Sequence, residues 1–331
     1  MKSFDHTPTH HCVTGSLRDI YAYYGHPLTE ELMLGLGEGV GFIYWHQKGQ
    51  PPFIGGRATP TPSLEELVGL RTGVQVITHT TSSQSKAESA MLNLLQSDNP
   101  VMIQVDMGFL PYFDFHGQEY HFGGHVVVVC DYDDSSHRVM IADRDEELHW
   151  VSLGDVTKAR GSTFKPFPPK NKWWTFDFSQ KRLPKKDEIN TAIRHQAERM
   201  LNPPISNLGV KGIRKTAKLM PEWDTIMTQE ELKWALFNAY IFISPVGGSG
   251  GGTFRYMFNR FLLEASALTD NSKLVVCADE FRHAGDAWEV VGEWCKNTSE
   301  KLPTDLKPLR EMIQHVADIE EQAWSHLCEA V

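Results

Sequence analysis

The chain has 331 residues, of which 41% are hydrophobic, so it can bury a sizeable core and is not expected to be disordered, collagenous or a coiled coil. Its net charge of -10 is opposite in sign to the basic surfaces that bind phosphate backbones, which argues against a nucleic-acid partner. The most apolar stretch, Trp234 to Ile243, is about half as long as a membrane-spanning helix, so no membrane association is expected.

The first half of the chain alternates helix and strand signals. Apolar residues recur at helical spacing from Val13 to Tyr24, and Gly25 ends that helix, so Cys12 is placed at its N-terminus. The patterns then predict, in chain order, a short helix over residues 29–35, loops over 35–41 and 47–62, a helix over 63–73, a strand over 74–78, a helix over 87–95 and a strand over 101–106.

Two β-rich runs follow, from His125 to Tyr132 and from Arg138 to Asp143, and the turn-forming residues 133–136 separate them. This pattern predicts an antiparallel hairpin, which residues 150–151 extend. In such a hairpin the start of the first strand and the end of the second meet at the same open end. His125 and Asp143 are therefore expected to lie together.

The second half changes character. Residues 161–186 are rich in proline, basic and aromatic residues and are predicted to be a linker. Helical patterns then cover residues 187–201, 228–243, 253–268, 273–296 and 304–330, interrupted by a glycine-rich loop over 245–252. We therefore expect an α/β (α+β) fold, with one domain over residues 1–178 and a mostly helical domain over residues 179–331.

The cysteines point to a reducing, cytoplasmic setting and to one reactive thiol. There are five, an odd number with no Cys-x-x-Cys pair, so neither a disulfide framework nor a zinc ribbon is predicted. A buried, apolar role is expected for four of them, Cys130, Cys277, Cys295 and Cys328, which lie in a β-rich run or in helical patterns. Cys12 differs because a helix N-terminus supplies partial positive charge that stabilises a thiolate.

Cys12, His125 and Asp143 form a candidate catalytic triad. A cysteine nucleophile needs a base within hydrogen-bond reach and a third group that orients the base. A lone cysteine or histidine is weak support, because each is more often a core residue. Here the order Cys, His, Asp along the chain fits a catalytic triad, and each residue lies at the predicted end of a helix or strand. Meeting all these conditions at once is stronger support than any one residue gives.

Longer motifs resemble known families. The segment HHCVTGSLRDIYAYYG, with GHVVVVCDYDD and VMIADRD downstream, resembles papain-like cysteine enzymes, particularly those that process bacteriocin leaders. The same segment, with LGLGEGVGF, GGR and GGHVVVV, is similar to the family of butirosin biosynthesis protein H. The segment GGSGGGTFRYMFNRFLLEA is similar to the domain of unknown function that often follows, so the resemblance covers most of the chain.

The resemblance implies an acyltransferase of antibiotic biosynthesis. It implies that Cys12 takes an acyl or aminoacyl group from the phosphopantetheine thioester of an acyl carrier protein or from an acyl-CoA, that His125 shuttles protons and that Asp143 orients His125. An amine-bearing small molecule is the implied acceptor. No bound cofactor or metal is implied. We expect the helical domain to close over the cleft, and the sequence leaves open whether the protein forms a homodimer.

The chain departs from papain-like peptidases in front of the nucleophile. Those enzymes place a glutamine there for the oxyanion hole, whereas this chain has Thr-Pro-Thr-His-His at residues 7–11. We therefore expect the Cys12 backbone N–H, with His10 or His11, to bind the oxyanion.

Three charged residues are further candidates for substrate binding. Glu38, in the glycine-rich stretch, could bind a cationic acceptor, although a solvated carboxylate is the default interpretation. Arg57 and Arg255 could bind a carboxylate or the phosphopantetheine phosphate, and ordinary ion pairs fit them equally well.

Other interpretations stay open. A cysteine amidase or peptidase would use the same triad, with water in place of the amine, and a small-molecule binding protein on this scaffold would have an unreactive Cys12. The stretch GLGEGVG lacks the Lys-Ser/Thr of a phosphate loop, so no nucleotide site is expected. A metal site, whose spacing matches no defined type, would use His6, His10, His11 and Cys12, with His121 and His125 as further ligands.

Overall fold

The computed structural model describes residues 4–47, 49–117 and 119–331, which form two compact units. The sheet unit contains the residues up to 33 together with 72–183, and the helical unit contains 34–71 together with 184–331. The chain therefore passes between the units three times. The last passage lies close to the predicted boundary at residue 178, whereas the placement of residues 34–71 with the C-terminal helices differs from the prediction.

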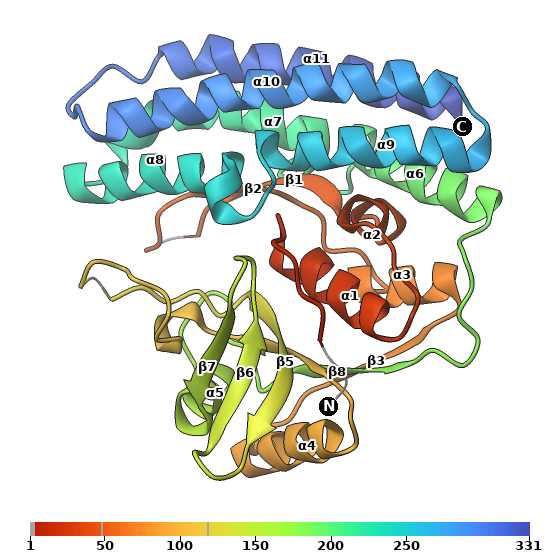
Figure 1. Cartoon of the computed structure of the whole chain (residues 1–331). Coiled ribbons are helices and arrows are strands. Elements are labelled where there is room, and N and C mark those ends of the chain that lie inside the picture. Colours follow the sequence, from red (N-terminus) through yellow and green to blue (C-terminus); the bar gives the residue numbers. More distant parts are fainter. Residues whose placement is uncertain (1–3, 48, 118) are drawn as a thin grey trace. The chain divides into compact units, whose positions relative to one another are not determined.

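The sheet unit is built on a six-stranded sheet whose neighbouring strands are all antiparallel (Figure 1). Its strand order is β3 (Gln75–His79), β8 (Trp173–Asp177), β4 (Val101–Val105), β5 (His125–Asp133), β6 (Arg138–Ala142) and β7 (Leu148–Ser152). A wholly antiparallel sheet with separate helices makes the fold α+β, as the sequence predicts. The predicted hairpin is present as β5 and β6.

The predicted linker over residues 161–186 is wrong in one respect. It contains β8, which lies between β3 and β4 and is the second strand from one edge of the sheet. The sequence Trp-Trp-Thr-Phe-Asp has the aromatic and β-branched residues that favour a strand. The prolines just before it belong to the connection from α5 (Leu153–Gly161), which the sequence analysis also missed.

Two sets of helices bury the faces of this sheet. Alternate residues of β4, β5 and β6 form one core with α4 (Gln84–Gln96) and α5. The helix α1 (Cys12–Tyr23) packs against β5 through buried residues that include Leu17 and Ile20. Every residue of β5 from His125 to Cys130 is buried, so the strand that begins with His125 is held firmly.

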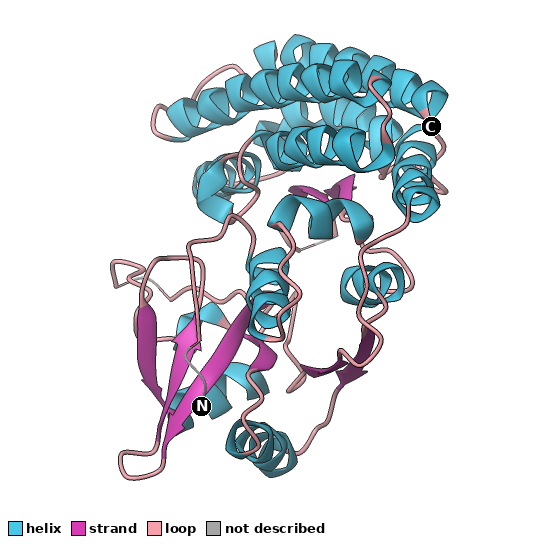
Figure 2. Ribbon diagram, turned by 45° about the vertical axis from the view of Figure 1, so that its right-hand side comes forward, coloured by secondary structure: helices cyan, strands magenta, loops and turns pink. Residues whose placement is uncertain are grey.

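The helical unit contains long helices and a two-stranded hairpin. The helices α10 and α11 run side by side (Figures 1 and 2). The helices of this unit are α6 (Lys186–Leu201), α7 (Gly209–Leu219), α8 (Gln229–Ile243), α9 (Arg255–Thr269), α10 (Lys273–Ser299) and α11 (Pro308–Ala330). All of these except α7 are predicted from the sequence.

The predicted loop over residues 47–62 contains a strand, and another strand begins at the end of the predicted loop over residues 35–41. Here β1 (Val40–Trp45) and β2 (Phe53–Arg57) pair antiparallel and pack on α7 and α8. Two helices span the passages between the units, α2 (Glu30–Leu36) and α3 (Leu64–Thr72). Short 3-10 helices complete the described elements: η1 (Met107–Phe109), η2 (Met220–Thr225), η3 (Pro245–Gly247) and η4 (Gly252–Phe254).

No helix within the described ranges has a stretch both long enough and apolar enough to span a lipid bilayer.

Candidate active site

Cys12 is the first residue of α1 and is partly exposed. His11 caps the helix with an extended backbone, and its Nδ1 accepts a hydrogen bond from the backbone N–H of Thr14 at 3.4 Å. The buried apolar residues of α1 fix the helix against β5, so its N-terminus has a defined place. The sulfur therefore lies where the helix concentrates its partial positive charge.

His125 and Asp143 meet at one end of the β5–β6 hairpin. His125 begins β5, Asp143 directly follows β6, and the register pairs Val128 with Ala142. The Nε2 atom of His125 lies 2.8 Å from each carboxylate oxygen of Asp143. The same ring hydrogen-bonds the Cys12 side chain, and because Nε2 faces Asp143, Nδ1 is left for the sulfur. The three predicted residues thus lie together within the sheet unit.

The electrostatics of the pair favour its charged form. Burial by itself lowers the pKa of His125, but the Asp143 carboxylate and the contact with Cys12 raise it to about 10. Burial by itself raises the pKa of Asp143, and the neighbouring His125 and the hydroxyl of Tyr112 lower it below its usual value. At neutral pH the site therefore holds an imidazolium beside a carboxylate, and an imidazolium stabilises a thiolate.

The other thiols that are buried have the opposite environment. Burial raises the pKa of Cys130 to about 12 and that of Cys277 to about 11, and it also raises the pKa of Cys295. These thiols stay protonated and unreactive at neutral pH. The core role predicted for them agrees with the structure, while Cys328 is partly exposed.

Two aromatic residues that the sequence analysis did not single out contact the histidine and the aspartate. The Tyr112 hydroxyl donates a hydrogen bond to Oδ2 of Asp143 at 2.8 Å, and its ring stacks on His149. The Phe113 ring meets His125 edge-on, with the ring centroids 5.7 Å apart. Six of the fourteen residues from 109 to 122 are aromatic, and this density is the signal that could have drawn attention to them.

Glu30, at the start of α2, holds the residues in front of Cys12. Its buried carboxylate accepts hydrogen bonds from the backbone N–H of His10 at 2.9 Å and of His11 at 3.2 Å, and from the Thr14 hydroxyl at 3.2 Å. Burial raises the pKa of Glu30. The backbone N–H groups of His10 and His11 are thus engaged by Glu30, so the structure argues against these two N–H groups as oxyanion donors.

Residues 4–11 form a strap that ties α1 to the end of β6. Nδ1 of His6 lies 2.6 Å from Asp19 on α1, and Nε2 of the same ring lies 2.8 Å from the carbonyl oxygen of Asp145. The backbone N–H of Thr9 donates to the carbonyl of Arg144, the residue after Asp143, at 2.9 Å. The strap therefore fixes the helix that carries Cys12 relative to the residues that follow Asp143.

Comparisons with known proteins identify the family. Residues 154–327, more than half of the chain, match the family described as Domain of unknown function (DUF4872). Residues 11–144 match the family described as Butirosin biosynthesis protein H, N-terminal, and this range contains Cys12, His125 and Asp143. The chain belongs to the family that combines these two domains. A search of the curated proteins found no match.

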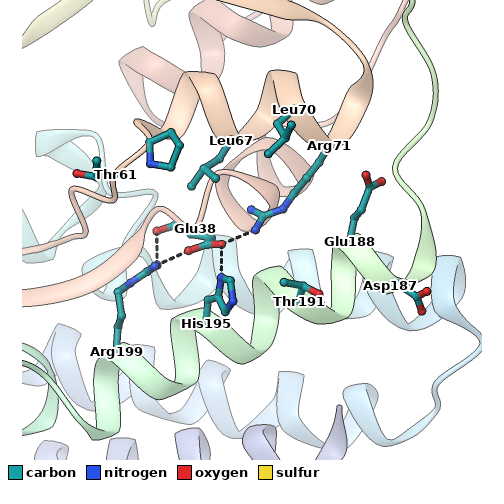
Figure 3. A pocket seen from close by; sticks show the side chains of 11 residues that line it. Glu38, Thr61, Leu67, Leu70, Arg71, Asp187, Glu188, Thr191, His195 and Arg199 are labelled. Atoms are coloured by element: carbon teal, nitrogen blue, oxygen red, sulfur yellow. Dashed lines mark hydrogen bonds and ion pairs between the residues drawn. The ribbon is translucent and has the colours of Figure 1, made fainter.

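Glu38, in the glycine-rich stretch of residues 35–41, is not placed to bind a cationic acceptor. Its buried carboxylate pairs with Arg71 and Arg199 and lies 3.0 Å from Nδ1 of His195 (Figure 3). Nη2 of Arg199 also donates to the Glu38 carbonyl at 3.0 Å. The predicted role in binding a cationic acceptor is therefore corrected, because two arginines already neutralise this carboxylate. Through these contacts Glu38 joins the glycine-rich stretch to α3 and α6. The same residues line a cavity of about 460 Å³.

Arg255 is likewise a structural residue in this conformation. Its side chain is fully buried and forms a bidentate ion pair with Glu320, with N–O distances of 2.7 and 2.8 Å. Its Nη1 atom donates to the carbonyls of Gly41 and Thr253. The predicted role in binding a substrate anion is thus corrected, since a carboxylate of the protein occupies the guanidinium. Arg57 ends β2, opposite Val40, and is half-buried.

Three histidines of the alternative metal site bind three different carboxylates. His6 contacts Asp19, His121 lies 3.0 Å from Asp106, and His125 contacts Asp143. Over residues 4–47, 49–117 and 119–331, no three side chains of the metal-binding types gather at one point.

Proposed function

We propose that the protein is an acyltransferase that carries an acyl or aminoacyl group on Cys12. The observation that supports this most is the hydrogen-bonded series from Cys12 through His125 to Asp143, at a helix N-terminus. Membership of a family described by a biosynthesis protein favours a biosynthetic enzyme. The proposed donor is a thioester of an acyl carrier protein or of coenzyme A, and the proposed acceptor is a small molecule with an amine.

The first half-reaction forms the acyl-enzyme. The Cys12 thiolate attacks the carbonyl carbon of the donor thioester, and the bond between that carbon and the donor sulfur breaks. The leaving thiolate takes the proton that His125 carries. Exchange of one thioester for another is close to balanced in free energy, so the step needs no external energy source.

The second half-reaction delivers the group. A neutral amine attacks the carbonyl carbon of the acyl-enzyme, the bond to the Cys12 sulfur breaks, and the amine proton passes to His125. This restores the imidazolium and the thiolate for the next cycle. Asp143 keeps the ring oriented through both steps, and we propose the Cys12 backbone N–H as an oxyanion donor. Amide formation from a thioester is strongly favourable, which drives the sequence forward.

Intact-protein mass spectrometry tests the proposal directly. Wild type and Cys12→Ala are incubated with a panel of small acyl thioesters, with and without primary amines. We expect a mass increase that depends on Cys12 and that amines discharge faster than water. Discharge by water alone would support the cysteine amidase or peptidase instead. The absence of any adduct, with a Cys12 that iodoacetamide does not modify at neutral pH, would support a non-catalytic binding protein.

A further inference from the structure

Tyr112 and Phe113 form a consecutive pair that contacts both the proposed base and the residue that orients it. The hydroxyl of Tyr112 donates a hydrogen bond to Asp143, and the ring of Phe113 packs against the His125 ring at a steep angle. Both rings are partly buried. We name the two residues the aromatic cap.

The backbone that carries the aromatic cap is anchored by Asp106. This fully buried carboxylate accepts hydrogen bonds from the backbone N–H of Gly108 and of Phe122, each at 3.1 Å. Leu110 is buried in the core of the sheet unit, and its carbonyl accepts a hydrogen bond from the N–H of Phe113 at 3.2 Å. The aromatic cap is therefore held in place by charge, packing and backbone hydrogen bonds.

The position of Phe113 affects whether water or an amine attacks the Cys12 acyl-enzyme. Either nucleophile must give a proton to His125 while the bond to the Cys12 sulfur breaks, and it forms a C–O bond in hydrolysis or a C–N bond in transfer. A bound water needs about two to four polar partners, and an apolar ring offers none. An amine acceptor brings binding contacts from the rest of its structure, so the same ring hinders it less.

We propose that the aromatic cap suppresses hydrolysis of the Cys12 acyl-enzyme, so that amine acceptors discharge it. This inference rests on the proposed function. Phe113 places an apolar ring, in place of water, against His125. Tyr112 is a positioning residue, which acts on His125 through Asp143 and keeps the carboxylate from turning away.

The test measures how the acyl-enzyme divides between water and an amine. Wild type, Phe113→Ala and Phe113→Leu are acylated with an acyl N-acetylcysteamine thioester and freed of excess reagent, and the adduct is followed by mass in buffer and in buffer with ethanolamine. We expect Phe113→Ala to raise the rate of hydrolysis relative to that of aminolysis by about tenfold, and Phe113→Leu to stay near wild type. Phe176→Ala, in a half-buried ring on β8, is the matched control.

Tyr112→Phe tests the positioning role separately. It removes only the hydroxyl, so we expect the pH profile of aminolysis to shift while the ring packing is kept. Tyr132→Phe is the control, because the Tyr132 hydroxyl bonds the exposed Asp134 at 2.9 Å. A purely structural role of Tyr112 would lower thermal stability and leave the pH profile unchanged.

The outcomes separate the two proposals. If wild type forms no adduct on Cys12, the proposed function fails. If the adduct forms and the ratio of hydrolysis to aminolysis is the same in Phe113→Ala as in wild type, the aromatic cap does not suppress hydrolysis. The proposed acyltransferase function is then unaffected. Should Phe113→Ala not fold, Phe113→Val takes its place with a smaller expected increase, and an unchanged ratio overturns the inference equally.

Discussion

Asp143 determines the charge that His125 carries in the folded protein. Burial lowers the pKa of His125, but the Asp143 carboxylate, with a further contribution from Cys12, raises it to about 10. A raised pKa contributes stability that is full below the unfolded value and is lost as pH rises through the folded value. In Asp143→Asn that carboxylate charge is gone, and burial drives the ring to its neutral form.

We therefore expect the two proteins to respond differently to alkaline pH. Between about pH 7 and pH 10, the free energy of unfolding of wild type should fall through this titration, and Asp143→Asn should show a smaller fall. At neutral pH, alkylation of Cys12 by iodoacetamide should slow by about tenfold in the variant, because less imidazolium faces the sulfur. Urea unfolding across the pH range and the mass of the alkylated protein measure the two effects. Equal slopes with pH in both proteins would contradict this account.

Some residues of the candidate site could be predicted from the sequence and others could not, because some are placed by local structure and others act through tertiary contacts. Cys12, His125 and Asp143 were predictable because helix and strand boundaries, read from local periodicity, already place them. Glu30, Tyr112 and Phe113 act through contacts that only the tertiary fold creates. For the charged residues Glu38 and Arg255, the sequence could not tell an ion pair within the protein from a ligand site.

At the scale of single elements, α1 and the strap meet at Gly15. A Cβ atom at this position would overlap the side chain of Thr9, whose backbone is held by Arg144. Gly154 in α5 offers a matched comparison, because a Cβ there would have only the Ser152 hydroxyl within ordinary contact range.

Replacing each glycine by alanine should have opposite effects. Gly154→Ala should stabilise the protein by about 0.5–1 kcal/mol through helix propensity alone. Gly15→Ala has the same intrinsic gain, but it must displace the strap and with it Cys12, so we expect a net loss of stability and slower alkylation of Cys12. Thermal unfolding and the alkylation rate of both variants give the comparison. A Gly15→Ala protein as stable and as reactive as Gly154→Ala would show that the strap is not rigid.

The elements that were predictable are those with a long, regular pattern. Most of the long helices follow from apolar residues at helical spacing, and the β5–β6 hairpin follows from two apolar runs around a polar turn. The strands β1, β2 and β8 are short and lie among glycines or prolines, whose local signal is that of a loop. Their pairing partners and the helices they pack on stabilise them, and such distant contacts leave no local pattern.

At the scale of the whole molecule, one buried charge network organises the helical unit. Glu320 of α11 binds Arg255 of α9, and it also accepts hydrogen bonds from the indole N–H of Trp288 at 2.6 Å and of Trp324 at 2.8 Å. All four side chains are fully buried. The Arg255 guanidinium extends the network to the carbonyl of Gly41, where β1 begins its hairpin.

Removing the charge of Glu320 should therefore destabilise this unit strongly. Glu320→Gln leaves a buried guanidinium without its counterion, and we expect a loss of about 3–5 kcal/mol. The adjacent Glu321→Gln removes a partly exposed partner of Arg214 and should cost less than about 1 kcal/mol. Helical circular dichroism during urea unfolding measures both variants. Similar losses at the two positions would mean that the network contributes no more than a surface ion pair.

The chain passes between the two units three times, and this limits which segments of the gene could be exchanged by recombination. The two family matches follow one another in sequence, at residues 11–144 and 154–327, as exchangeable modules would. The compact units do not follow that order, because the β1–β2 hairpin lies inside the first match yet packs on helices of the second. A gene that acquired the first segment with a foreign partner would expose the apolar face of this hairpin. We therefore expect the two matched segments to be inherited together and to evolve together.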